Sequence, residues 1–412
     1  MPDIARLTGR FKKQELTAEP LRVRPKNSEQ IVQVLRDWKR FPSPVRPLGG
    51  NSSATRCAKV HGGTELDMSA INRVLKLDRK TVTVEAGMRL RDLVRFLADR
   101  NLELLATDEQ LDRSVGGLVS SGSLSSSTAM DEANLAACVT ALGLVTPNGR
   151  ELDFDASKPE MLRLLRQSYG LMGIICWVTL RVRPQTLYTV RHGKMGFAEL
   201  AQLIPQMGTA KAGVKVFLLP FRDRAFVELR DAGIAGAEPR SKSWQFMDWL
   251  SNKLLPDIVH LLRRLPGRRL RDPLIDGFSE ATQALINPRL VDAGSNAMEQ
   301  TGKFRRVGDK ARIQQSTWAF PAREFKAALY SYREYCQRYY KTSGFRCDLP
   351  AIVHRLPQDP GAVLSPAHDG PVFALSIRTT VTAGWDDFLI DFAMIAARFG
   401  GVPTFNQTRG FT

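Results

Sequence analysis

Apolar residues in the first half of the chain occur in short strand-like runs that alternate with helical patterns. Residues 81–87 alternate β-branched and polar positions and close on Glu-Ala-Gly, which predicts a strand that ends in a glycine turn. Leu90, Leu93 and Leu97 then recur at helical spacing, so a helix is expected directly after that strand. The elements predicted up to Pro184 are strands at 81–87, 137–145 and 174–182 and a helix at 89–100.

The second half of the chain has a different pattern. Two strand-like runs, 214–219 and 225–229, are separated only by a short segment beginning Pro-Phe-Arg-Asp, which predicts a hairpin in another sheet. Strands flanked by long helices are typical of an α+β domain in which helices back a sheet. The remaining predicted elements are strands at 316–320 and 372–379 and helices at 322–340 and 385–399.

Length supports a division into domains. At 412 residues the chain is longer than a single hydrophobic core usually supports. The strand and helix pattern of the first half ends at Pro184, which we take as the first boundary. The predicted division is a first domain at 1–186, a second domain at 187–385 and a C-terminal segment at 386–412.

Composition narrows the class of protein. An apolar share of 43% is ordinary for a globular chain, whereas a formal net charge of +17 favours anionic partners such as phosphorylated ligands, anionic lipids or nucleic acid. Apart from the net charge, no feature of the sequence supports nucleic-acid binding, so we predict no nucleic-acid partner. The sequence has neither an apolar leader nor an apolar run of membrane-spanning length, so a cytoplasmic protein is expected.

The cysteines and histidines form no metal-binding pattern. The five cysteines are scattered and odd in number, and the five histidines show neither HExxH nor another paired spacing. We therefore predict reduced cysteines and no metal site.

Residues 253–271 form a basic segment in which leucines alternate with arginines. One interpretation is a peripheral contact with an anionic membrane, with the leucines against the lipid and the arginines on its phosphates. The other interpretation is a solvated helix that covers the second domain. The sequence leaves both open.

Two glycine-rich stretches carry the candidate chemistry. In Pro-Leu-Gly-Gly-Asn-Ser-Ser, residues 47–53, glycines allow close backbone approach and the following N–H and hydroxyl groups suit a diphosphate. In residues 114–123, glycines and serines surround the apolar Leu118 and Val119, which predicts a packed stretch. Neither GxGxxG nor GxxxxGK[ST] occurs, which argues against Rossmann and P-loop folds.

The order of these motifs resembles a known family. A Pro-Leu-Gly-Gly-x-Ser loop, a strand ending in Glu-Ala-Gly, a helix, a Ser-Val-Gly-Gly stretch and a Gly-Ile-Ile strand before a proline are similar to the FAD-binding domain of the vanillyl-alcohol oxidase and p-cresol methylhydroxylase (PCMH-type) superfamily. The sugar and polyol branch, with aldonolactone, alditol and decaprenylphosphoryl-ribose oxidases, looks most similar. The resemblance spans about residues 25–185 and returns at Gly-Gly-Val-Pro-Thr-Phe-Asn-Gln, residues 400–407.

The resemblance implies a fold and a set of cofactor-binding residues. The fold is a PCMH-type FAD-binding domain of two subdomains, followed by a substrate domain with an antiparallel sheet backed by helices. The C-terminal segment is expected to re-enter the flavin site. The residues implied to bind FAD are Leu48, Gly49, Gly50, Asn51, Ser52, Ser53, Ser114, Gly117, Ser120, Ser121, Gly122, Ser123 and Ile175.

Substrate-side residues also follow from the resemblance. Gln315 and Thr317 are expected on a strand that faces the flavin, whereas Trp318 is expected in the core. Gln407 stands where the family has a lysine near the flavin N1/C2 carbonyl, and an amide supplies no full charge there. For His354 and Arg346 we favour structural interpretations, a buried histidine and a surface arginine, over substrate contact.

The attachment of the cofactor departs from many family members. These bond the flavin through a histidine after the glycines, and Asn51 occupies that place here. Asparagine cannot form this bond, so non-covalent FAD is expected.

The function implied by the resemblance is oxidation of a hydroxyl-bearing carbon in a polyol, sugar, lactone or related alcohol. The hydride passes to flavin N5, and oxygen or an electron-acceptor partner reoxidises the cofactor. The alternative is a protein that keeps the fold without the chemistry and acts as a binding or assembly partner. Leu124 and Ser125, which replace a family His-Gly, and Gln407 motivate this alternative.

Overall fold

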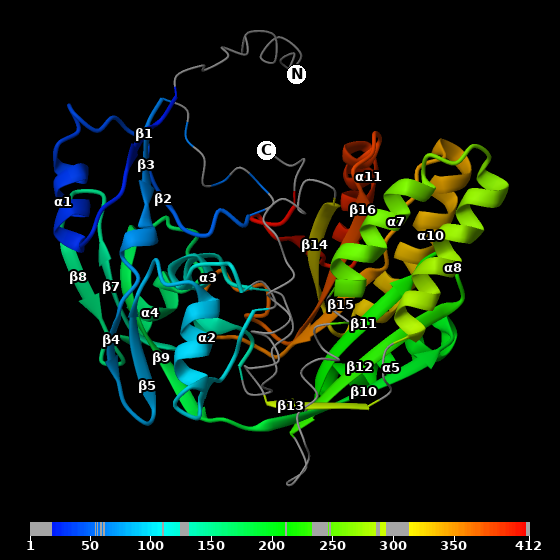
Figure 1. The fold of residues 1–412 in the computed structure, drawn as a ribbon, viewed down its shortest axis with the longest axis horizontal. Coiled ribbons are helices and arrows are strands. Elements are labelled where there is room, and N and C mark those ends of the chain that lie inside the picture. The colour runs from blue at the N-terminus through cyan, green and yellow to red at the C-terminus, as the bar shows by residue number, and fades with distance from the viewer. Residues whose placement is uncertain are drawn as a thin grey trace, which may run out of the picture.

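Two sheet-based domains lie side by side in the computed structural model of the chain (Figure 1). The N-terminal half forms the smaller sheets, and the C-terminal half forms a large antiparallel sheet with long helices. This arrangement confirms the predicted α+β class. The structure describes residues 19–53, 55, 57, 60, 62–108, 111–123, 132–210, 212–232, 246, 249–285, 289–293 and 313–408.

A small parallel sheet positions the first glycine-rich stretch. Its strand order is β1 (Leu21–Val23), β3 (Thr64–Asp67) and β2 (Val45–Leu48). Helix α1 (Ser28–Arg36), capped by the side chain of Asn27, buries Ile31 and Val34 in the core beside this sheet. Because β2 ends at Leu48, the chain leaves the sheet directly before the two glycines.

A six-stranded sheet forms the rest of the first domain. Its valines at 82 and 84 face the core together with the leucines of helix α2 (Leu90–Ala98), as the helical spacing predicted. Helices α3 (Val115–Ser121) and α4 (Pro159–Leu165) add apolar residues to the same core. The strands are β4 (Val74–Leu77), β5 (Thr81–Glu85), β9 (Ile174–Pro184), β7 (Val139–Val145) and β8 (Glu151–Phe154) in that order, with β6 (Leu102–Leu104) on β9, and 3-10 turns lie at Met68–Ala70 and Leu135–Cys138.

The second domain is built on an eight-stranded sheet. The predicted hairpin is present as the antiparallel pair β11 and β12. The last strand, β17, pairs with β14 at the edge of the sheet. In sheet order the strands are β13 (Arg289–Ala293), β10 (Leu187–Met195), β12 (Arg224–Ala232), β11 (Gly213–Leu219), β15 (Ala351–Leu356), β16 (Val372–Thr380), β14 (Ile313–Pro321) and β17 (Val402–Pro403).

Three helices cover one face of this sheet. They are α5 (Phe197–Thr209), α10 (Phe325–Ser343) and α11 (Trp385–Ala397), and their buried aromatic residues pack with alternate strand residues. Phe325 and Phe373 stack with ring centroids 4.7 Å apart. Because α11 shares this core, the chain beyond Trp385 packs with the second domain before it reaches β17. The boundaries near residues 186 and 385 stay predictions.

A helix pair, α7 (Leu255–Leu262) and α8 (Arg268–Ala284), follows a turn of π-helix at Leu250–Leu254. Leu255, Val259 and Ile275 pack against Leu349 in a separate small core. The basic segment 253–271 therefore spans a break between two helices, where the sequence had suggested one.

One prediction about an arginine was wrong. Arg346 was interpreted as a surface side chain, yet only 5% of the residue is exposed. Its guanidinium lies between three carboxylates, those of Asp272, Asp276 and Asp348, which neutralise it inside the fold. His354 is buried, as expected.

The loop after β15 ties the two domains together. Asp359 in this loop is buried and accepts a hydrogen bond of 2.6 Å from Gln167 Nε2 of the first domain. Arg163 and Arg166 of the first domain donate to the carbonyl oxygens of Pro360 and Gly361 at 3.2 Å. These contacts fix how the large sheet sits against the glycine-rich stretches.

Gly87, at the end of the predicted strand and turn, has no room for a side chain. A Cβ there would lie 1.8 Å from the carbonyl oxygen of Met68, which is backbone and cannot move aside. Gly87→Ala should therefore lower the free energy of unfolding by about 1–3 kcal/mol. The matched control is Gly277→Ala in α8, where nothing lies within 4 Å and helix propensity favours alanine. Denaturant unfolding should separate the two variants, and equal stabilities would contradict this account.

Candidate functional site

The first glycine-rich loop packs directly on the second. A Cβ on Gly49 would lie 2.0 Å from Ser114 Oγ, and a Cβ on Gly50 would lie 2.4 Å from the carbonyl oxygen of Asp112. Only glycine allows this approach. Asn51 follows with a φ of +47°, a left-handed conformation that asparagine tolerates better than most residues. The two stretches, distant in sequence, thus form one surface.

The second stretch begins as helix α3, whose N-terminus is already satisfied. Ser114 is the N-cap, and its Oγ accepts from Gly117 N at 3.3 Å. The N–H groups of Val115 and Gly116 donate to the carbonyl oxygens of Met88 and Ala86, both at 2.8 Å. Because these N–H groups already have acceptors, a diphosphate beside α3 would be held by the adjacent loop and by the serines at the end of the helix. Ser114 acts on the site by positioning this helix.

A buried ion pair holds the end of the serine-glycine stretch. Arg113 Nη1 lies 2.9 Å from Asp108 Oδ2, with side-chain exposures of 6% and 0%. Arg113 Nη2 also donates to Ser121 Oγ at 2.7 Å and to the carbonyl oxygen of Gly122 at 3.3 Å. Ser123 donates to the same Asp108 carboxylate. The serines predicted to bind cofactor are thus fixed from behind by a charged pair.

The C-terminal segment reaches this surface. Asn406 Nδ2 donates to Ser121 Oγ at 3.2 Å, and the carbonyl oxygen of Asn406 accepts from Thr55 N at 3.4 Å. Gln407 lies half-buried in the same turn, where its N–H donates to the carbonyl oxygen of Thr404 at 3.1 Å. This segment therefore lies beside both glycine-rich stretches.

The same segment is clamped to strand β14. Thr404 Oγ1 and Thr408 Oγ1 both donate to the carbonyl oxygen of Thr317 at 3.1 Å. Thr408 Oγ1 also accepts from Ser316 Oγ at 3.2 Å. Strand β14 is thereby brought to the turn that holds Gln407, and through it to the cofactor loops.

Polar side chains lie on the face of the large sheet opposite helices α5, α10 and α11. Thr317 Oγ1 is 2.8 Å from Ser376 Oγ on the neighbouring strand, and Gln315 Nε2 donates to Thr317 Oγ1 at 3.3 Å. Arg378 and His354 are buried on the adjoining strands. Trp318 points to the helix-covered core, as predicted, because successive strand residues face opposite sides.

A segment with strained backbone, residues 167–169, lies against the serine-glycine stretch. Gln167 and Tyr169 have φ values of +55° and +54°, and their N–H groups donate to the carbonyl oxygens of Val119 and Ser120 at 2.8 and 2.7 Å. Strain of this kind gathers at functional sites. Tyr169 packs edge-to-face on Phe405, with ring centroids 5.4 Å apart. Burial raises the pKa of the Tyr169 phenol, so it stays protonated near neutral pH.

The predicted residues thus fall into two groups. The loops at 48–53 and 114–123, Gln407, Gln315 and Thr317 are linked through the contacts above. Ile175 lies at the start of β9 and packs on the core of the six-stranded sheet. Leu124 and Ser125 lie outside the described residues.

Sequence reasoning missed several residues of the site. Arg89 donates to the carbonyl oxygen of Asp112 at 2.7 Å and brings a cation against Gly50. Arg113, Tyr169 and Asn406 were missed as well. Tyr169 and Asn406 have partners in distant segments, whereas Arg113 binds Asp108 and Ser121 nearby in the chain and lies next to a predicted motif residue.

The residues present fit a dinucleotide. Two loops without Cβ atoms at their closest approach form one surface, serine hydroxyls border it, and the Arg89 guanidinium adds positive charge beside Gly50. Across the described ranges, no group of three or more histidine, cysteine or acidic residues is arranged to hold a metal ion. Nor does any helix in these ranges have the length and apolar character needed to cross a membrane.

Comparisons with known proteins agree with this geometry. A family described as an FAD binding domain matches residues 20–155. The chain is 35% identical over 164 residues to L-gulonolactone oxidase from Bos taurus. This match covers 39% of this chain and 37% of that protein. It is 29% identical over 251 residues to L-gulono-1,4-lactone dehydrogenase from Mycobacterium tuberculosis, covering 60% of this chain and 57% of that protein. The matches therefore span less than two thirds of these relatives.

Solved structures match over nearly the whole chain. A protein described as a solvent-stable cholesterol oxidase has a TM-score of 0.69 at 16% identity, over 95% of this chain and 84% of that one. A cholesterol oxidase from Brevibacterium sterolicum has a TM-score of 0.70 at 14% identity, over 92% of this chain and 80% of that one. At these identities the likeness concerns the fold. The FAD binding domain at residues 20–155 and the aldonolactone enzymes among the relatives in sequence support the resemblance to the PCMH-type FAD-binding superfamily and its sugar and lactone branch.

Proposed function

We propose that the protein is an FAD-dependent oxidoreductase that oxidises a hydroxyl-bearing carbon of a polyol, sugar, lactone or related alcohol. The observation that carries this proposal is the link from the two glycine-rich loops, through Asn406 and the turn at Gln407, to Thr317 on the large sheet. A cofactor on the loops and a substrate on the sheet would meet at that turn. The relatives named as lactone oxidases and dehydrogenases support a lactone as the first substrate to test.

The cofactor is held without a covalent bond in this proposal. Residues 48–53 and the serines at 120–123 bind the diphosphate and ribityl groups through backbone N–H groups and hydroxyls, with Ile175 near the adenine. Ser114 and Gly117 act as cap and first turn of the helix behind them. Asn51 has no nucleophile that could attach the flavin.

The chain's own contribution to the reaction is binding and orientation. When bound, FAD supplies the two-electron acceptor, and oxygen or an electron-acceptor partner takes the electrons onward. Gln315 and Thr317, joined by a 3.3 Å hydrogen bond, would hold the substrate hydroxyl on the sheet. The Tyr169 phenol, protonated because burial raises its pKa, can donate a hydrogen bond near the same turn. Gln407 donates through an amide where a charged group would stabilise negative charge more strongly.

We further propose a cytoplasmic protein that contacts a membrane surface through the segment 253–271. Leu261 and Leu270 are 62% and 63% exposed on the helix pair, next to several arginines. Exposed leucines beside cations suit an anionic lipid surface. Co-sedimentation with phosphatidylcholine vesicles that contain phosphatidic acid tests this contact.

The central test is a spectrum of the purified protein. It should show oxidised flavin, acid precipitation should release free FAD into the supernatant, and anaerobic L-gulono-1,4-lactone or a related polyol should bleach the absorbance. Flavin that stays with the precipitate would contradict non-covalent binding. A colourless protein that FAD cannot reconstitute would favour the alternative of a binding or assembly partner.

Gly50→Ala tests the cofactor loop. The added Cβ would meet the Asp112 carbonyl oxygen at 2.4 Å, so the loop must move away from α3. The dissociation constant for FAD should rise by about tenfold or more, which corresponds to about 1.4 kcal/mol. The control Gly370→Ala lies in a loop with nothing within 4 Å of its Cβ and should bind FAD as the parent does. Unchanged affinity in Gly50→Ala would remove this loop from the cofactor site.

Gln407→Lys tests the position at the turn. An ammonium stabilises developing negative charge better than an amide, so the rate of anaerobic bleaching should rise by about tenfold or more. Gln206→Lys on the exposed side of α5 adds the same charge far from the loops and should leave the rate unchanged. Equal rates in the two variants would show that Gln407 lies away from the reacting end.

A further inference from the structure

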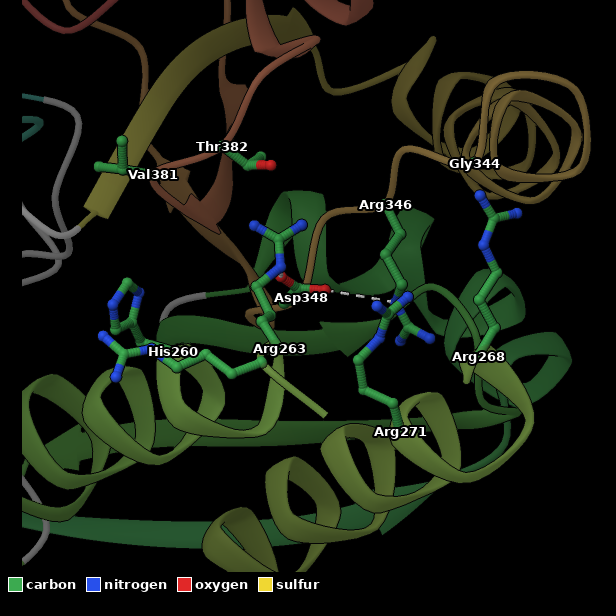
Figure 2. Close-up of a pocket in the computed structure, with 10 residues that line it drawn as sticks. His260, Arg263, Arg268, Arg271, Gly344, Arg346, Asp348, Val381 and Thr382 are labelled. Atoms are coloured by element: carbon green, nitrogen blue, oxygen red, sulfur yellow. Dashed lines mark ion pairs between the residues drawn. The ribbon is translucent and has the colours of Figure 1, made fainter. Parts of the chain in front are cut away.

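A basic pocket lies between the helix pair α7–α8 and the loops that follow α10 and β16 (Figure 2). Its volume is about 410 Å³, and none of its lining residues belongs to the glycine-rich loops. Arginines from three separate parts of the chain converge on it. They are Arg263, Arg264, Arg268, Arg271 and Arg346.

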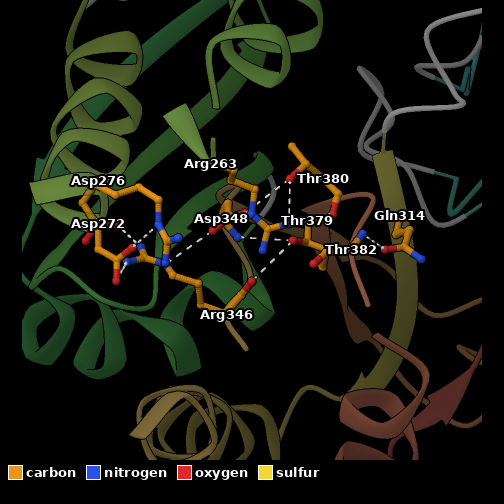
Figure 3. A network of polar contacts seen from close by, with 10 residues as sticks. Arg263, Asp272, Asp276, Gln314, Arg346, Asp348, Thr379, Thr380 and Thr382 are labelled. Atoms are coloured by element: carbon orange, nitrogen blue, oxygen red, sulfur yellow. Dashed lines mark hydrogen bonds and ion pairs between the residues drawn. The ribbon is translucent and has the colours of Figure 1, made fainter. Parts of the chain in front are cut away.

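The inner wall of the pocket is neutralised and rigid. Arg346 lies between Asp272, Asp276 and Asp348, and Asp348 in turn accepts from Arg263 Nε at 2.6 Å (Figure 3). Arg263 also donates to Thr380 Oγ1 at 3.1 Å. This network fastens the helix pair to the large sheet. It holds the carboxylates in place around Arg346 and Arg263.

The outer wall carries positive charge, and its Arg268 lies over the ring of Tyr340, 5.7 Å from the centroid. Within the part of the chain that the structure describes, no carboxylate forms an ion pair with Arg264 or Arg268. The first turn of α8 contains no acidic residue. Figure 2 shows Arg268 and Arg271 rising from α8 towards the same opening as Arg346. Like charges held this close repel one another, so their grouping stabilises the fold less than it would stabilise a bound anion.

Gly344 makes the convergence possible. It ends α10 with a φ of +75°, and a Cβ there would lie 2.1 Å from Arg268 Nη2. The missing side chain leaves room for this guanidinium at the pocket. The glycine at the end of α10 thus allows the Arg268 guanidinium to lie at the pocket.

We propose that this pocket binds a phosphate or diphosphate group at a site separate from the flavin. Guanidinium groups present paired N–H donors that match the oxygens of a phosphate, and several at once give charge-assisted hydrogen bonds. The volume admits a diphosphate with part of the group it esterifies. A monocarboxylate has a single negative charge, which is less than the positive charge of the outer wall, so a phosphate matches the pocket better.

The rim suggests two sources for the same phosphate chemistry. Val381 lines the pocket and is 50% exposed, and Leu261 and Leu270 on the helix pair are 62% and 63% exposed. A phospholipid headgroup would place its acyl chains against them, whereas a soluble phosphorylated compound would use the arginines alone.

Inorganic pyrophosphate titrated calorimetrically into the FAD-loaded protein tests the pocket. The flavin absorbance, recorded in parallel, should stay constant and exclude displacement at the cofactor loops. Arg264→Gln/Arg268→Gln should weaken binding by about tenfold or more, since two charge-assisted partners are lost. The control Arg269→Gln/Lys341→Gln removes the same charge from exposed neighbouring positions outside the lining and should stay within about twofold of the parent. Circular dichroism checks that all variants fold.

Vesicles distinguish the sources. Co-sedimentation with phosphatidylcholine vesicles that contain phosphatidic acid, lost in Arg264→Gln/Arg268→Gln and kept in the control, supports a lipid headgroup. Pyrophosphate binding without vesicle binding supports a soluble ligand and removes the membrane contact. The proposal is overturned if neither probe binds, or if the control variant loses binding as fully as the pocket variant. A protein that fails to retain FAD but binds pyrophosphate only with the pocket intact would sink the proposed oxidoreductase and leave the pocket standing.

Discussion

The buried pair of Arg113 and Asp108 is the interaction on which the candidate cofactor site depends. Removing one partner of such a pair leaves an uncompensated charge and typically costs about 3–5 kcal/mol. This is a large part of the free energy of unfolding of a typical domain, about 5–15 kcal/mol. Here the same two side chains also bind Ser121, the Gly122 carbonyl oxygen and Ser123. The serine-glycine stretch thus keeps one conformation although its own residues are small and flexible.

Coupling between the domains follows from that fixed stretch. Ser121 is the point at which Asn406 attaches, and the threonines at 404 and 408 carry the contact on to Thr317. On the opposite side, Asp359 reaches from the second domain to Gln167. Attachments at two different places restrain rotation of the large sheet against the first domain and so set the spacing between the loops and the polar face of the sheet.

Much of the fold was readable from the sequence because its signals are local. The leucines at 90, 93 and 97 marked α2, and the glycine-rich stretches marked the cofactor loops. Most of the missed features depend on contacts between segments that are distant in the sequence, whereas Arg113 pairs with the nearby Asp108. Arg346 resembles a surface arginine in the sequence, but Asp272 and Asp276 of α8 and the neighbouring Asp348 surround it in the fold. The role of Tyr169 is visible only from its positive φ and its contact with Phe405.

The net charge of +17 also takes on a different meaning once the side chains are placed. The two glycine-rich loops of the candidate cofactor site offer glycine backbone and serine hydroxyls, and Arg89 is the cation set against Gly50. Arginines gather instead around α7 and α8, where they outnumber the carboxylates. A dinucleotide needs shape and many weak donors along its length, whereas a compact anion needs concentrated charge. The two regions of this chain divide these tasks, so concentrated positive charge lies at the arginine pocket rather than at the two glycine-rich loops.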